Sequence, residues 1–233
     1  MPSTSNVHLV IPIYNNYPML HELLWKLQRI EGKNISSITL VDDCSPDPEV
    51  AGGMKWWASE YGSKFPIHIL RNSDNLGFLL TSNGGLQYVC NKNNDADIVI
   101  LLNTDVKINY PFIQQIKDII EVNPKSLIGG ILYTQSTGWN VFNDKIYPYI
   151  EGWLMATTVS GWKELDYLDE RYTPCDFEDV HLSTKALSLG YELAPLNNPG
   201  IFHVGGASIG YTDKRLEQTK INQKKFEEAW TNS

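Results

Sequence analysis

Short apolar runs alternate with longer stretches in which apolar residues recur every three or four positions. Four runs have the length and β-branched composition of strands: Val7–Ile13, Ile38–Val41, Ile67–Leu70 and Ile98–Leu102. The stretches between them have helical spacing: Leu20–Ile30, Val50–Tyr61 and Leu80–Cys90. Strands that alternate with helices in this way predict an α/β fold, with a mostly parallel central sheet flanked by helices.

The pattern is less regular after Asp105. It predicts a helix through Ile113–Ile120, a strand at Leu127–Tyr133, loops and short strands through residues 134–152, a helix at Phe177–Leu189 ended by Gly190, and a polar helix at Asp213–Trp230. We find no internal repeat, low-complexity tract or linker. We therefore expect a single domain over residues 1–233, with a nucleotide-binding type of first half and a more irregular second half.

Composition excludes several classes of protein. The chain has 233 residues and a formal charge of −8, and its 19 Lys and Arg residues are spread along its length, so nucleic acid is not an expected partner. Cys44, Cys90 and Cys175 are far apart, which favours reduced thiols and a cytoplasmic location over a disulfide framework or a zinc site. The longest apolar run, Ile98–Leu102, is too short to span a membrane, and the chain could be one domain of a larger protein.

Polar residues follow four predicted strands, where open parallel sheets bind their ligands. They are Pro12–Asn16, Asp42-Asp43, Arg71-Asn72 and Asn103–Asp105, and no glycine-rich dinucleotide or phosphate-binding loop accompanies them. The carboxylate oxygens of Asp105 are hard ligands of the kind that Mg²⁺ and Mn²⁺ prefer, but an Asp in this position also commonly caps a turn. Asp42 and Asp43 have the same alternative role as turn residues, here before Pro46.

Two further positions carry candidate chemistry. Glu178 and Asp179 open a predicted helix, where they serve either as charge-stabilised first-turn residues or as a general base that the helix terminus keeps ionised at neutral pH. An isolated His203 is typical of a packed or surface residue. Beside Asp105, however, its nitrogen would complete the protein half of a Mn²⁺ site, with diphosphate and water in the remaining positions.

Six segments in order carry a family pattern. They are Val10–Asn15, Val41–Ser45, Asn75–Phe78 continuing to Asn83–Gly85, Leu101–Val106, Phe177–Val180 and His203–Ser208. Together they resemble the inverting glycosyltransferases of family 2, which have the GT-A fold, and most closely the rhamnosyltransferase-like members. The resemblance runs from Val7 to about Ser208, and it implies a complete catalytic unit with no room for a membrane anchor or an acceptor-binding domain.

The resemblance implies a role for each matching position. Pro12 and Tyr14 would flank the base, Asp42 and Asp43 would contact base and ribose, and Asn75, Gly77 and Asn83 would line the nucleotide and sugar. Asn103 and Thr104 would add polar donor contacts, and Asp105 and His203 would hold Mn²⁺ or Mg²⁺. Residues 1–105 would then bind the nucleotide sugar, residues 106–210 would hold metal and acceptor, and residues 211–233 would form the polar C-terminal helix.

The implied reaction is a single displacement that transfers a hexose from a nucleotide-diphosphate sugar to a glycan hydroxyl. The donor would be linked to UDP or dTDP, with rhamnose or glucose as candidate sugars. Asp179 would deprotonate the acceptor, Glu178 would contact the acceptor or act as a backup carboxylate, and Trp153 is the candidate aromatic for acceptor stacking. The diphosphate would leave beside a metal ion held by Asp105 and His203, an ion that an acidic protein needs as counter-charge.

The chain departs from the family pattern at two places, and two other functions compete. His181 stands where relatives often have Asp, and Ala156–Thr158 stand where relatives often have Arg. A sugar-nucleotide pyrophosphorylase would need a charged, glycine-rich loop after the first strand, which Tyr14–Pro18 does not provide. A non-catalytic nucleotide-sugar or glycan-binding module is the alternative from another class.

Overall fold

The protein is described here by a computed structural model that covers residues 5–205 and 212–231. Within these residues, seven strands form the central sheet. They run in the order β12 (Glu192–Pro195), β6 (Ser126–Gly129), β11 (Leu154–Thr158), β4 (Ile98–Leu102), β1 (Val7–Ile13), β2 (Ser37–Asp42) and β3 (Ile67–Arg71). β11 is antiparallel to β4 and β6, and the other neighbours are parallel, so the predicted, mostly parallel sheet is confirmed.

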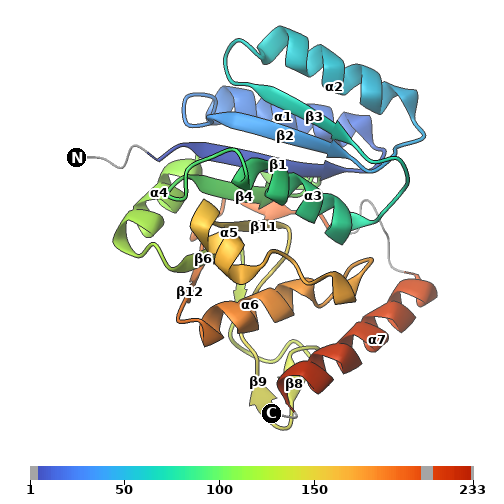
Figure 1. Ribbon diagram of the computed structural model, residues 1–233, viewed down its shortest axis with the longest axis vertical. Coiled ribbons are helices and arrows are strands. Elements are labelled where there is room, and N and C mark those ends of the chain that lie inside the picture. Colours follow the sequence, from blue (N-terminus) through green and yellow to red (C-terminus); the bar gives the residue numbers. More distant parts are fainter. Residues whose placement is uncertain (1–4, 206–211, 232–233) are drawn as a thin grey trace.

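Helices cover both faces of this sheet (Figure 1). One apolar core contains α1 (Tyr17–Ile30), α2 (Pro48–Tyr61) and α4 (Ile113–Val122), and the other contains α3 (Phe78–Cys90), α5 (Val159–Leu165), α6 (Glu178–Ser188) and α7 (Asp213–Trp230). The alternation of side chains along β1 makes this possible, because Leu9 and Ile11 enter the first core while Val10 enters the second. The strand is therefore apolar throughout, as strands buried on both faces are.

Small elements bring distant segments together beside the main sheet. β5 (Val106–Ile108) pairs with β13 (Ile201–His203), β7 (Leu132–Tyr133) pairs with β10 (Tyr149–Ile150), and β8 (Val141–Phe142) pairs with β9 (Lys145–Ile146). A 3₁₀ turn, η1 (Glu170–Tyr172), precedes α6. The β5–β13 pair matters most, because it places the two ends of the second half of the chain side by side.

Most predicted elements are confirmed, and Leu127–Tyr133 is the main exception. This segment is two strands, because β6 ends at Gly129 and β7 leaves the sheet to pair with β10. At Gly130 a β-carbon would overlap the Trp153 ring, so the backbone passes that indole at a position where only glycine fits. Gly190 follows α6 with φ +81°, as expected for the residue that ends a helix.

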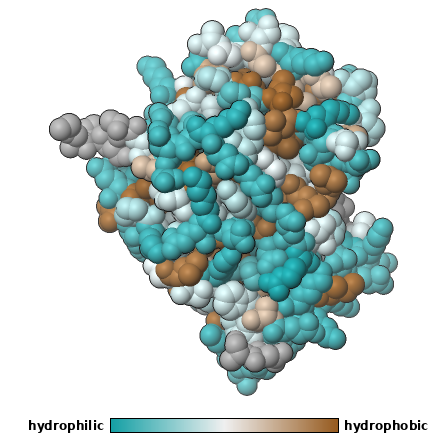
Figure 2. Space-filling view, in the orientation of Figure 1, coloured by the Kyte–Doolittle hydropathy of each residue, from teal (hydrophilic) through white to brown (hydrophobic). Residues whose placement is uncertain are grey.

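The described surface is mostly polar on the face shown in Figure 2, where hydrophobic residues form separate small patches. Among the helices of the described residues, none is both long and apolar enough to cross a membrane. Gly206, Ala207 and Ser208, the end of the sixth sequence segment, lie outside the described residues.

Candidate active site

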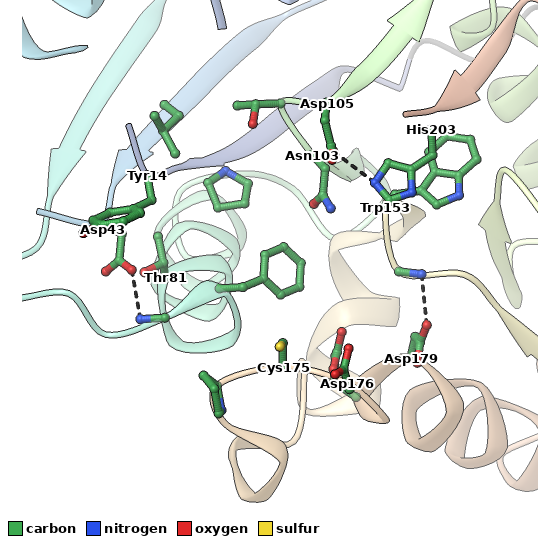
Figure 3. A pocket seen from close by; sticks show the side chains of 18 of the residues that line it. Tyr14, Asp43, Thr81, Asn103, Asp105, Trp153, Cys175, Asp176, Asp179 and His203 are labelled. Atoms are coloured by element: carbon green, nitrogen blue, oxygen red, sulfur yellow. Dashed lines mark hydrogen bonds and ion pairs between the residues drawn. The ribbon is translucent and has the colours of Figure 1, made fainter. Parts of the chain in front are cut away.

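A cavity of about 570 Å³ opens at the carboxyl ends of β1, β2 and β4. Its walls come from loops of both halves of the chain (Figure 3). Twelve of the predicted site residues line it: Pro12, Tyr14, Asp43, Asn75, Gly77, Asn103, Thr104, Asp105, Trp153, Glu178, Asp179 and His203. The parallel topology explains why the residues that follow β1, β2 and β4 meet, because carboxyl ends of parallel strands share one edge of the sheet.

The loop before α3 is held in the cavity wall by Asp43. One carboxylate oxygen of Asp43 accepts hydrogen bonds from the backbone N–H of Leu76 at 2.8 Å and from the Asn72 amide at 2.9 Å, and the other accepts from the N–H of Gly77 at 2.9 Å. Gly77 has φ +87°, a conformation that glycine adopts without strain. Asp43 therefore shapes the wall that contains Asn75 and Gly77, and Tyr14, 38% exposed, stands beside it.

Asp105 and His203 meet through the β5–β13 pair. His203 is opposite Val106 in this pair, and the backbone N–H of Val204 donates to the carbonyl of Asp105 at 3.1 Å. The imidazole Nε2 of His203 consequently lies 3.0 Å from Oδ1 of Asp105, as Figure 3 shows. Residues almost a hundred positions apart in the sequence thus share one corner of the cavity.

The donor set of this corner fits a divalent cation such as Mn²⁺. Two ligands about 2.1 Å from one ion, on neighbouring corners of an octahedron, are about 3 Å apart, which is the separation of the Asp105 and His203 donor atoms. The Oδ1 atom of Asn103, in the same wall, is buried without a hydrogen-bond partner among the described residues. Among the described residues, no three His, Cys, Asp or Glu side chains are arranged so that they could hold a metal ion, so a bound diphosphate and water would have to supply the remaining ligands.

Asp179 lies in the opposite wall, at the first turn of α6. Its Oδ2 accepts from the N–H of Gly152 at 3.2 Å and its Oδ1 from the N–H of Val180 at 2.8 Å. Burial raises the pKa of Asp179 to about 7, although these two N–H groups lower it, and the charges of Glu151 and Asp176 raise it further. At neutral pH Asp179 is therefore divided between its ionised and its protonated form, because desolvation offsets the effect of the helix terminus.

Glu178 is more deeply buried than Asp179. Only 7% of it is exposed, and its Oε2 has no hydrogen-bond partner among the described residues. Burial, followed by the neighbouring charge of Asp179, raises the pKa of Glu178 well above its usual value. The two adjacent carboxyl groups therefore differ in environment, which makes them candidates for different roles.

Two of the residues predicted to bind the nucleotide sugar, Asp42 and Asn83, do not line the cavity. Asp42 is fully buried, forms an ion pair with Arg71 and accepts from the N–H of Ser45 at 2.9 Å. Asn83 donates to the carbonyl of Leu168 at 2.8 Å and accepts from the N–H of the same residue at 3.0 Å. Both side chains are occupied by contacts that hold the walls together.

Trp153 lines the cavity but differs from the exposed aromatic that we expected. Only 2% of it is exposed, and its ring stacks on that of His203, with centroids 5.7 Å apart and planes at 16°. Its Nε1 donates to the carboxylate of Glu151 at 3.1 Å. A sugar ring would find little open face on this indole.

Sequence reasoning missed three charged residues of the lining. Glu151 lies beside Trp153, and Asp176 binds the guanidinium of Arg215, which comes from α7, at 2.7 Å. Glu151 lies two residues before Trp153, so proximity to that candidate aromatic was an available signal. The pairing of Asp176 with Arg215 had no such signal, because it depends on where a polar helix docks.

Comparison with known proteins identifies a family for this chain. The sequence model of "Glycosyl transferase family 2" matches residues 8–175, more than half of the chain. A search of curated protein sequences finds no significant match.

Similar solved structures share the fold at low sequence identity. GalNAc-T7 with UDP, GalNAc and Mn²⁺ has a TM-score of 0.75 and 14% identity, and the match covers 97% of this chain and 48% of that one. The mannosyltransferase PcManGT from Pyrobaculum calidifontis with GDP-Man and Mn²⁺ has a TM-score of 0.62 and 17% identity, and the match covers 83% of this chain and 55% of that one. S. aureus TarS 1-349 with UDP-GlcNAc has a TM-score of 0.62 and 16% identity, and the match covers 93% of this chain and 65% of that one.

These matches cover about half to two thirds of the length of those three structures. The likeness shows that the α/β architecture is the GT-A fold, as the sequence pattern predicted. With the family match over residues 8–175, it leads to one conclusion: this chain belongs to glycosyl transferase family 2.

Proposed function

We propose that the chain transfers a sugar from a nucleotide-diphosphate sugar to a hydroxyl acceptor with inversion at the anomeric carbon. One observation carries this proposal: the Asp105–His203 pair and the Asp179 carboxylate face the same cavity from different walls. An inverting displacement needs its base and the site of its leaving group on opposite sides of the reacting carbon.

The donor side of the cavity would hold the nucleotide diphosphate. Pro12, Tyr14, Asn75 and Thr104 line this side, and Asp43 keeps the α3 loop in place. Asp105 and His203 would hold Mn²⁺ or Mg²⁺, which supplies positive charge for the departing diphosphate. Six lining residues are acidic (Asp43, Asp105, Glu151, Asp176, Glu178 and Asp179), and the one Arg or Lys among the lining residues described, Arg215, already pairs with Asp176.

The acceptor side would be the wall that contains Asp179. In the displacement, the acceptor oxygen bonds to the anomeric carbon while the bond from that carbon to the diphosphate oxygen breaks. The hydroxyl proton passes to Asp179, and the electron pair leaves with the diphosphate. Burial suits Asp179 to this role, because a base with a pKa near the working pH combines an ionised fraction with a strong affinity for the proton.

The test separates donor binding from transfer. The wild-type chain is screened against UDP-, dTDP- and GDP-sugars, with and without Mn²⁺, by thermal shift and by release of free nucleoside diphosphate. We expect one donor class to raise the melting temperature more strongly with Mn²⁺, because a ligand that binds only the folded state stabilises it. NMR of the product, or of the hydrolysed sugar, then reports the anomeric configuration.

Two variants assign the roles of the cavity walls. Asp179→Asn should retain donor binding but lower turnover by about 10²–10⁴-fold, the usual contribution of a general base. Asp105→Ala should lose the Mn²⁺-dependent part of the thermal shift. Asp118→Asn, on the exposed face of α4, is the matched control and should change neither. Full turnover in Asp179→Asn would refute the proposed base, and donor binding without any diphosphate release would favour a non-catalytic binding module.

A further inference from the structure

The imidazole of His203 lies between two carboxylates. Its Nε2 is 3.0 Å from Oδ1 of Asp105, and its Nδ1 is 3.9 Å from Oε1 of Glu151. Neither carboxylate is fully open to water, since the exposed fractions of the Asp105 and Glu151 side chains are 8% and 32%. The two ring nitrogens therefore face different acceptors, and the ring can be read as a bridge between them.

A neutral imidazole has one nitrogen with a proton and one with a free lone pair. Nε2 faces Asp105, the other proposed ligand, so Nε2 is the atom that must offer its lone pair to a cation. The proton then has to lie on Nδ1, which faces Glu151. A carboxylate at this position stabilises that tautomer and makes the imidazole a better ligand.

The same carboxylate also controls the plane of the imidazole. Oε2 of Glu151 accepts from Nε1 of Trp153 at 3.1 Å and from the hydroxyl of Tyr133 at 3.4 Å. Trp153 in turn stacks on His203 with the ring planes 16° apart. One oxygen of Glu151 thus anchors the indole that flanks the ring, while the other faces its Nδ1 atom.

From these contacts we propose that Glu151 is a positioning residue for metal binding, acting through the tautomer and the orientation of His203. The inference rests on the proposed function, since it takes Asp105 and His203 as the cation ligands. It adds a residue that sequence reasoning did not select. Glu151 acts through His203 and Trp153, and its role is measurable without turnover.

The experiment follows Mn²⁺ and Mg²⁺ binding by the whole chain. Titration of MnCl₂ into the protein with UDP present, followed by electron paramagnetic resonance, gives the Mn²⁺ affinity. We expect Glu151→Gln and Glu151→Ala to weaken it by about 10–100-fold, the usual effect of removing such an outer partner. With MgCl₂, ¹⁵N spectra of the five histidines should show the Nδ1–H tautomer of His203 in the wild type and a smaller fraction of it in Glu151→Gln.

Matched variants separate this role from simple destabilisation. Tyr133→Phe removes the other side-chain donor to Oε2 but leaves the oxygen facing His203, so its Mn²⁺ affinity should remain within about twofold of wild type. Trp153→Phe retains a flanking ring and should weaken binding less than Glu151→Ala. If Glu151→Ala does not fold, Glu151→Gln carries the test, with folding checked by circular dichroism.

The outcomes distinguish this inference from the proposed function. If the wild type binds Mn²⁺ only as weakly as Asp105→Ala does, the proposed metal pair itself is wrong. If the wild type binds Mn²⁺ and Glu151→Gln binds it equally well, Glu151 has no positioning role and the metal pair stands. Weaker binding with an unchanged His203 tautomer would also overturn the inference, because Glu151 would then act by another route.

Discussion

Asp179 and Glu178 are neighbours in the sequence, but the fold gives them different surroundings. Asp179 accepts two backbone hydrogen bonds and is half-buried, whereas Glu178 is buried with one oxygen unpartnered among the described residues. Residue type and helix position made both of them candidates for the base. The difference between them comes from the degree of burial and from the charge of Glu151, which lies in another segment of the chain and raises the pKa of Asp179.

The pH profile of the reaction should report the environment of Asp179. Because Asp179 must be ionised to accept a proton, kcat/KM should fall below a pH of about 7, and its acid limb should give the pKa of the free enzyme. Asp176→Asn removes a negative charge that raises this pKa, so the acid limb should move to lower pH. Kinetics from pH 5 to 9, with the donor that the thermal-shift screen identifies, provide the measurement, with Asp118→Asn as the control. An acid limb that Asp176→Asn leaves in place would show that Asp179 is not the titrating group.

At the scale of elements, the buried side chain of Asn222 joins α7 to the segment that precedes α6. The two N–H groups on Nδ2 of Asn222 are shared among the carbonyls of Tyr172, Cys175 and Asp176, which lie 2.8, 2.8 and 3.0 Å from that nitrogen. Nearby, the indole of Trp230 donates to Nδ1 of His181 at 3.0 Å. His181, the position where relatives often have Asp, thus forms part of this helix attachment.

Asn222→Ala should lower the free energy of unfolding by about 2–3 kcal/mol, because it leaves buried carbonyls without their donor. Asn222→Asp should be worse, since it puts a carboxylate oxygen against the same carbonyls. Urea unfolding measures both changes. Lys224→Ala, on the exposed face of the same helix, should stay within about 0.5 kcal/mol of the wild type. Equal stability of Asn222→Ala and Lys224→Ala would contradict the attachment.

Element prediction succeeded where apolar spacing extended over many residues. The alternating strands and helices of the first half and the long polar α7 were all predictable from periodicity. α5 was missed because its seven residues, which include Gly161, are too few to show a period. The break between β6 and β7 was missed because it depends on the contacts of Gly129 and Gly130 with Ile150 and Trp153, which only the folded chain forms.

At the scale of the whole molecule, the buried carboxyl groups link stability to pH. Glu178 and Asp179 have raised pKa values, so the folded state retains protons that the unfolded state releases. Stability from these two groups is therefore fully present below their unfolded pKa values and is lost as pH rises through their folded ones. His181, whose pKa burial lowers to about 4, has the opposite slope between about 4 and 6.5.

Glu178→Gln should isolate the contribution of that carboxyl group. The neutral side chain removes the cost of ionising a buried group, so the variant should be more stable than wild type at pH 8, with a melting temperature at least about 2–4 °C higher. At pH 4 the difference should shrink, because both side chains are then neutral. The contribution of His181 cancels, because it is the same in both proteins. Thermal melts at pH 4, 6 and 8 measure the effect, and a difference independent of pH would contradict it.

The amino-acid sequence by itself determined the layered α/β architecture, because the spacing of apolar residues depends only on local geometry. Strand-end motifs also determined the family and most of the cavity lining, since parallel strands bring their carboxyl ends to one edge. Tertiary structure alone decided three other matters. The side chains of Asp42 and Asn83 are engaged in hydrogen bonds within the cavity walls, Glu151 faces His203, and burial raises the pKa of Asp179. Each of these depends on contacts between residues far apart in the sequence, and on the water that those contacts exclude.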